Sequence, residues 1–164
     1  MGNAITYRMP SGIPGAVTRT QGATIEPQLF DSAAPFVGYG LPAKFGAGGK
    51  LAPITTGDAA AAIKGILVRP FPTTSSQDGV GVSTPPTSGV GNLLRRGYIN
   101  VKLNGATASA KEGAVYVRVA AAAAGKPIGG IEAAADSTNT IVMTGATFTG
   151  PADADGNVEI AYNL

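Results

Sequence analysis

Three residue types that carry much of protein chemistry are missing from this sequence: cysteine, histidine and tryptophan. Without cysteine the chain can form no disulfide and offers no thiol nucleophile and no thiolate zinc ligand. Without histidine it lacks the most frequent general base and the commonest metal ligand, so every His-dependent catalytic triad is excluded. We therefore expect no catalytic residue, no cofactor and no metal site, and a protein that is not an enzyme.

Charge is also scarce, at 13% of 164 residues against roughly a quarter in an average protein. All 12 lysines and arginines lie at or before Lys126, whereas five of the 10 acids lie before that point and five after it. Such asymmetry favours head-to-tail contacts between copies, or contacts with an assembled partner. The alternative is that the two sets of charges face each other within one folded chain.

Long apolar runs are absent as well. The longest, Val119 to Ala124, is far too short to cross a bilayer, and the first 15 residues hold no stretch of signal-peptide length. Basic residues are adjacent only at Arg95-Arg96, and no patch combines them with aromatic side chains. We expect a soluble protein made in a cytoplasm, with neither a membrane nor a nucleic acid as partner.

What the sequence does contain is short apolar runs separated by 24 glycines and 12 prolines. Residues 96–103 alternate strictly, with Ile99, Val101 and Leu103 on one face of a predicted strand. Further strands are predicted over residues 63–71, 113–119, 140–144, 146–148 and 158–164. The pattern predicts an all-β fold, either a small β-barrel or a jelly-roll-like sandwich, with short or no helices.

Two segments fall outside this pattern. Residues 1–24 carry repeated glycine and proline without helical periodicity, and they are predicted to form an extended N-terminal arm. Residues 72–92 are rich in proline, serine, threonine and glycine, which predicts a long projecting loop. We expect residues 25–164 to form a single β domain that carries this loop.

Two stretches resemble ligand sites but depart from the required spacing. Gly125-Lys126 lacks the glycine five residues earlier and the following Ser or Thr of a phosphate loop, where Ala120 and Pro127 stand instead. The alternating acids of residues 153–159 lack the glycine and glutamate positions of a calcium loop, so a hairpin turn is predicted. The five alanines before Gly125 are too few to hold a helix, and a loop is predicted there.

The arm carries apolar side chains that do not suit a freely solvated tail. Ile5, Tyr7 and Met9 have the alternate spacing with which an extended segment adds to a neighbouring sheet edge. The basic pair on a predicted strand is a second candidate contact. The predicted partner-binding residues are Ile5, Tyr7, Arg8, Met9, Ile13, Arg19, Arg95 and Arg96.

Several stretches together resemble the structural cement proteins that decorate the heads of tailed bacteriophages. They are RMPSGIPGAVTR near the start, GILVRPFPT, PPTSGV followed by LLRRGY and VKLNG, then GAVYVRVA, GKPIGGIEAAAD and the ending FTGPADADGNVEIAYNL. The resemblance spans nearly the whole chain, and its motifs are specific as a set and weak singly. None of them is a catalytic motif.

This resemblance implies a small β-barrel or jelly-roll-like capsid decoration protein, bound in many copies to the outer surface of the assembled virion. Its implied partners are the major capsid protein and neighbouring copies of itself, as a homo-oligomer on the shell. It implies no substrate and no cofactor, and synthesis in the bacterial host cytoplasm.

Two other functions stay open. The loop at residues 72–92 is compatible with a carbohydrate- or receptor-binding β module of a phage fibre or spike, although aromatic residues make up only 6% of the chain. A hydrolase would need a lysine or carboxylate as its base.

Overall fold

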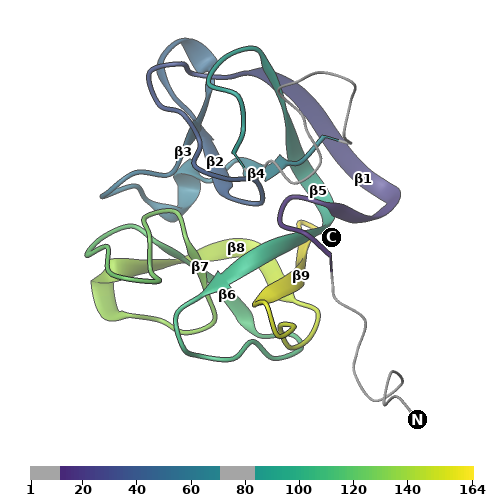
Figure 1. Ribbon diagram of the computed structural model, residues 1–164, viewed down its shortest axis with the longest axis vertical. Coiled ribbons are helices and arrows are strands. Elements are labelled where there is room, and N and C mark those ends of the chain that lie inside the picture. Colours follow the sequence, from purple (N-terminus) through teal and green to yellow (C-terminus); the bar gives the residue numbers. More distant parts are fainter. Residues whose placement is uncertain (1–11, 71–83) are drawn as a thin grey trace.

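The computed structural model describes residues 12–70 and 84–164, and within these ranges it is all-β, as predicted (Figure 1). The strands are β1 (Val17–Leu29), β2 (Pro42–Phe45), β3 (Leu51–Pro53), β4 (Gly65–Val68), β5 (Val90–Asn104), β6 (Ala114–Arg118), β7 (Ile131–Glu132), β8 (Thr140–Phe148) and β9 (Asn157–Tyr162). Three single 3-10 turns accompany them: η1 (Ala47–Gly49), η2 (Ala60–Ala62) and η3 (Ser137–Asn139). The described residues contain no helix long and apolar enough to cross a membrane.

Five strands close into a barrel, which decides between the two predicted architectures. β5 pairs with β7, β7 with β6, β6 with β8 and β8 with β9, and β9 returns to pair with β5. The contact between β5 and β7 is parallel and the others are antiparallel. Closure leaves these strands without a free edge along most of their length.

The long strand β5 belongs to two sheets at once. Its C-terminal half is a barrel strand, whereas its N-terminal half pairs with β4, which continues through β2 to β3. β1 lies antiparallel along the other side of β5. In Figure 1 this outer sheet lies above the barrel, and β5 runs through both.

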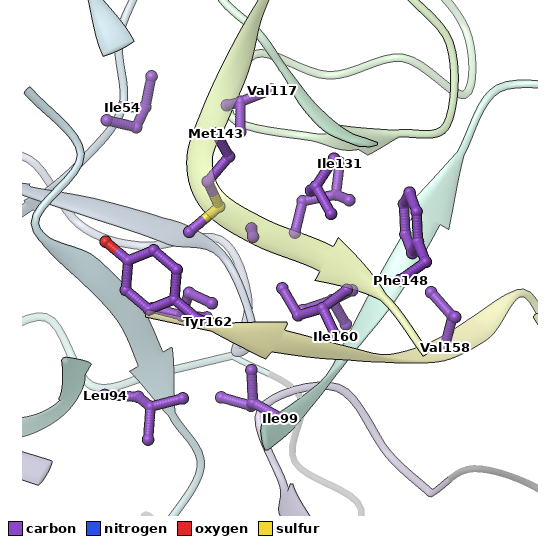
Figure 2. Close-up of a cluster of buried hydrophobic side chains, with 14 of the residues drawn as sticks. Ile54, Leu94, Ile99, Val117, Ile131, Met143, Phe148, Val158, Ile160 and Tyr162 are labelled. Carbon is purple, nitrogen blue, oxygen red and sulfur yellow. The ribbon is translucent and has the colours of Figure 1, made fainter. Parts of the chain in front are cut away.

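The predicted alternation places the core. Ile99 and Val101 of β5 are fully buried in the barrel, where Val117, Phe148 and Ile160 meet them from the other strands (Figure 2). Burying a side chain of this size contributes roughly 1.5–3 kcal/mol, so the barrel interior dominates the stability of this half. A second cluster fills the opposite face of the outer sheet, and its members are Phe30, Phe36, Tyr39, Ala43, Leu51, Leu67 and Leu93.

Three predicted boundaries differ from the structure. The arm was placed at residues 1–24, but Val17–Leu29 form β1, so the predicted boundary falls inside a strand. The loop was placed at residues 72–92, but β5 already begins at Val90, and residues 71–83 lie outside the described ranges. Residues 140–148 form the single strand β8 where two strands were predicted.

β1 escaped prediction because none of its residues is fully buried, so no buried apolar face marks the strand. Its residues are mostly exposed, and its pairing with β5 slips between Arg19, opposite Tyr98, and Thr24, opposite Arg96. Five steps along β1 therefore match two along β5, and residues 20–23 form a bulge. An exposed edge strand interrupted by a bulge has no regular pattern of apolar residues.

Candidate interaction surface

The structure places the described half of the predicted partner-binding residues around one pair of strands. Ile5, Tyr7, Arg8 and Met9 lie outside the described residues, and their role stays a prediction. The other four lie on or just before the adjacent strands β1 and β5, and they are Ile13, Arg19, Arg95 and Arg96. Ile13 is 52% exposed directly before β1.

The basic pair on β5 does not form one patch. Successive strand residues point to opposite faces. The Arg95 guanidinium donates to the main-chain oxygen of Lys64 at 2.6 Å and lies 3.5 Å from the Glu26 carboxylate. Arg95 thus ties β5 to its neighbours, while Arg96 is exposed. Of the two predicted contact residues, only Arg96 is exposed, and its role in binding stays a prediction.

An apolar strip lies on the same two strands and was not predicted. Ile25 and Leu29 of β1 are 41% and 58% exposed, and Val90 of β5, directly opposite Leu29, is 62% exposed. Pro27 is exposed between the two β1 residues. We call these four residues the β1 strip. The signal in the sequence is the alternate spacing of Ile25, Pro27 and Leu29, which becomes visible only once a strand is known to be there.

The β1 strip lies beside an edge that is poorly suited to strand addition. Within the described residues β1 pairs only with β5. The Phe30 amide donates to the Gly89 carbonyl oxygen at 2.9 Å, so the backbone groups of Pro27 and Leu29 point away from β5. Proline at such a position removes an outward N–H, and the bulge at residues 20–23 interrupts the edge further. Side chains, and not main-chain groups, are therefore the main groups that this surface exposes.

A polar cluster fixes the beginning of β1 to the barrel wall. The Thr18 hydroxyl donates to Glu159 Oε1 at 2.5 Å, and Arg19 Nη2 donates to Oε2 at 2.8 Å. The Arg19 guanidinium also lies 3.9 Å from the centre of the Tyr98 ring, a cation–π contact. Burial by itself opposes ionisation of Glu159, but the hydrogen bonds from Thr18 and Arg19 outweigh it and lower the pKa of this carboxyl.

A groove of about 600 Å³ runs from this cluster across the outer face of the barrel. Its lining includes Arg19, Tyr98, Lys111 and Glu112, together with small side chains such as Ala161. Its rim carries both signs of charge. The groove brings together no set of groups that would act as a nucleophile with its base.

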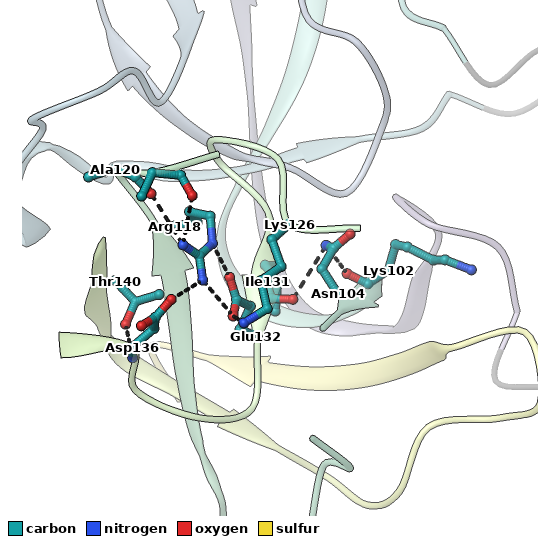
Figure 3. Close-up of polar contacts among 10 residues, drawn as sticks. Lys102, Asn104, Arg118, Ala120, Lys126, Ile131, Glu132, Asp136 and Thr140 are labelled. Carbon is teal, nitrogen blue, oxygen red and sulfur yellow. Dashed lines mark hydrogen bonds and ion pairs between the residues drawn. The ribbon is translucent and has the colours of Figure 1, made fainter. Parts of the chain in front are cut away.

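The most deeply buried charge in the described part of the chain is Arg118 of β6, whose side chain is 1% exposed. Its guanidinium donates to both oxygens of Glu132, at 2.5 and 3.1 Å, and to Asp136 at 2.7 Å (Figure 3). It also donates to the carbonyl oxygens of Ala120 and Ala121. The hydrogen bonds that Arg118 donates to Glu132 and Asp136 raise the pKa of Arg118, and Arg118 lowers the pKa of Asp136. The arginine holds the alanine-rich loop in place.

The charge asymmetry of the sequence is neutralised in part within the fold, where three of the five acids after Lys126 pair with bases from the earlier part of the chain. Bases from the first 126 residues pair with acids from the last 38 at Arg19–Glu159, Arg118–Glu132, Arg118–Asp136 and Lys126–Glu132. The two sets of charges therefore face each other within one chain. This favours the second of the two interpretations left open by the sequence.

The stretches tested as ligand sites have structural roles. The Asp153 carboxylate accepts a hydrogen bond from the Asn157 amide at 2.7 Å and closes the predicted turn into β9. Lys126 lies in a turn with Ala123 and is 3.6 Å from Glu132. The part of the chain that the structure describes contains no group of three or more acidic residues placed to hold a metal ion.

Comparison with known proteins gives one family and one fold. The model of the XM1 gp53 minor capsid protein family matches residues 2–162 of the chain. A chain of the solved structure described as "The capsid of Myoviridae Phage XM1" superposes with a TM-score of 0.68 at 18% identity, over 99% of this chain and 97% of that one. No curated protein matches the chain significantly. At 18% identity the structural likeness is evidence of a shared fold.

Proposed function

Because the chain belongs to the XM1 gp53 minor capsid protein family and is thus a structural protein of a phage capsid, we propose that it acts as a cement protein. In this role it binds the outer surface of the assembled head and stabilises contacts between major capsid protein subunits. The observation that carries the proposal is the β1 strip, an exposed apolar surface. It lies on the edge strand β1, which pairs with β5 outside the closed five-stranded barrel.

The β1 strip has the properties expected of a contact that is repeated over a shell. Leu29 and Val90 are adjacent and largely exposed, and apolar groups gathered in this way mark interaction sites. Arg96 on the same strand pair adds a charge that steers association. A contact of this size is weak alone, but tethering through a second contact raises its effective concentration.

The N-terminal residues supply that second contact in this proposal. The described chain begins at Gly12, whose Cα lies close to the side chain of Asn100 on the outer face of the barrel. Eleven residues precede it, enough to span about 35 Å when extended. Ile5, Tyr7 and Met9 would contact a neighbouring subunit. Binding only the assembled state stabilises that state by mass action.

Charging the β1 strip should release the protein from heads. Replacing Leu29 and Val90 together with glutamate places two unpaired carboxylates in the proposed contact, and we expect affinity for heads to fall at least tenfold. Co-sedimentation with assembled heads, compared with free shell subunits, measures this. Val37→Glu is the matched control, because Val37 is 77% exposed but lies outside the β1 strip. Equal binding of the double variant and the control would refute the β1 strip as the contact.

Removal of residues 1–11 tests the second contact separately. We expect occupancy on heads to fall, and the heads to lose resistance to heat and low salt, because the tethering effect is lost. Quantitative gel analysis of purified heads gives the occupancy. Undiminished occupancy would refute the role of the arm, and heads without any of this protein that are as robust as complete heads would refute the cement function.

A further inference from the structure

Residues 12–19, which we call the strap, form the connection between the N-terminal segment and the β domain. The Gly15 amide donates to the Asn100 carbonyl oxygen at 2.8 Å, and the Asn100 amide donates to the Ala16 carbonyl oxygen at 2.9 Å. The Arg69 amide donates to the Gly15 carbonyl oxygen at 2.8 Å. The strap therefore lies along the edge of β5 and makes main-chain hydrogen bonds to β5 and to the residue after β4, two segments that are distant in sequence.

The far end of the strap pairs with β5 and is also held by one side chain of the barrel. Glu159 of β9 accepts hydrogen bonds from Thr18 and from two nitrogens of Arg19. The Glu159 side chain is only 12% exposed, whereas that of Arg19 is 53% exposed. The fixed partner is thus the carboxylate on the barrel, and the exposed partner belongs to the strap.

We propose that Glu159 is the positioning residue of the strap, and that it holds the strap against the barrel only while its carboxylate is ionised. An ionised carboxylate accepts all three hydrogen bonds. A protonated one accepts fewer and no longer attracts Arg19. The strap then depends on its main-chain hydrogen bonds and on the contact between Arg19 and the Tyr98 ring, and it opens more often.

The groups that face Glu159 determine the direction in which its pKa shifts. β1 contributes Thr18 and Arg19, β5 contributes Asn100 in the register position opposite Glu159, and the Thr149 hydroxyl after β8 donates to the main-chain oxygen of Glu159. The other titratable residues that line the groove beside Arg19 are Tyr98, Lys111 and Glu112.

These partners hold the pKa of Glu159 below its ordinary value of about 4.3. A carboxyl whose pKa is lowered by folding stabilises the folded form above the unfolded pKa, and this contribution is lost as pH falls through the folded pKa. The strap is therefore held at neutral pH and released in acid.

The consequence for the shell rests on the proposed function. A strap that is fixed to β5 and β9 transmits a force on the N-terminal segment to the barrel. A loose strap would detach from the barrel before it transmitted that force. The positioning role itself can be measured on the free, full-length protein, so its failure is distinguishable from failure of the cement function.

Hydrogen exchange followed by NMR at single amides tests the proposal. The Gly15, Asn100 and Arg69 amides report on the strap, and the Leu103 and Arg118 amides, which donate within the barrel, report on global opening. In Glu159→Gln we expect the strap amides to lose protection at least threefold at pH 7, with barrel amides unchanged. Wild-type protein should show the same selective loss only in acid, after correction for intrinsic exchange, and the variant should show no further pH-dependent loss.

Two further variants keep the test sharp. Glu26→Gln removes the other glutamate that pairs with an arginine at the β1–β5 contact, and it should leave strap protection unchanged. Thr18→Val removes one hydrogen bond while Arg19 still pairs with Glu159, so it should lower strap protection by a smaller factor. A loss below threefold in Glu159→Gln, or a parallel loss at barrel amides, would overturn the proposal.

Discussion

Replacing Arg118 with methionine should lower the free energy of unfolding by about 3 kcal/mol. Removal of one partner of a buried ion pair typically costs about 3–5 kcal/mol, because the other charge stays buried without compensation. Here Glu132 would be that charge: its side chain is 6% exposed, and only Lys126, at 3.6 Å and partly exposed, would still face it. The lower end of the range applies because Asp136, at 40% exposed, keeps water near one side of the cluster.

The change removes contacts at one site, but it should lower the stability of the whole domain. Arg118 also holds the carbonyl oxygens of Ala120 and Ala121, so the variant leaves a loop without its central donor. For a chain of this size we expect the melting temperature to fall by roughly 6–12 °C. Urea unfolding followed by circular dichroism gives the free energy, and calorimetry gives the temperature.

Two control variants distinguish the cost of an unpaired buried charge from the cost of lost packing. Replacing Arg118 with methionine and Glu132 with leucine together should cost less than the sum of the single changes, because both buried charges are then removed. Asp136→Asn should have a small effect, since that carboxylate is partly exposed. If the double variant were less stable than the sum of the single losses predicts, the interpretation of the cluster as a buried ion pair would be wrong.

The barrel could be predicted from the sequence because burial in it follows the alternation of residues. Val115 and Val117 of β6, and Val158 and Ile160 of β9, are buried as a period of two requires. Arg118 interrupts this rule, because its position on β6 predicts a solvent-facing side chain. Its partner Glu132 is 14 residues away and is brought to it by the pairing of β6 with β7.

The interaction surface could be predicted only in part, for the same reason. Ile13 and Arg19 were identified because they stand in a segment with apolar residues and no periodic pattern. Val90 could not be identified, since its neighbour Leu29 is 61 residues away and adjacent only through the register of β1 and β5. Local composition indicates which residues are exposed. The interaction surface depends in addition on which strands pair, and paired strands can be separated by a loop of almost any length.

Alanine at Gly15 or Gly40 should destabilise the protein by about 3 kcal/mol, and the loss should appear first as opening of the strap. Both glycines have positive φ, at +87° and +75°. A Cβ at Gly15 would lie 2.6 Å from Cβ of Tyr39, and one at Gly40 would lie 2.7 Å from the Gly15 nitrogen. The backbone strain costs about 1–2 kcal/mol and the overpacking about 1–3 kcal/mol.

The strap should open before the rest of the domain for two reasons. It packs directly against Gly40, so an added Cβ displaces it, and few hydrogen bonds hold it to the domain. We therefore expect the Asn100 and Arg69 amides, which donate to strap carbonyls, to exchange faster, while the Leu103 amide stays protected. Gly22→Ala is the matched control, since Gly22 has φ of +80° but no atom within 4 Å of its added Cβ. It should cost about 1 kcal/mol and leave the strap closed. If Gly22→Ala and Gly40→Ala behaved alike, close contact between strap and barrel would not be what fixes the N-terminal segment.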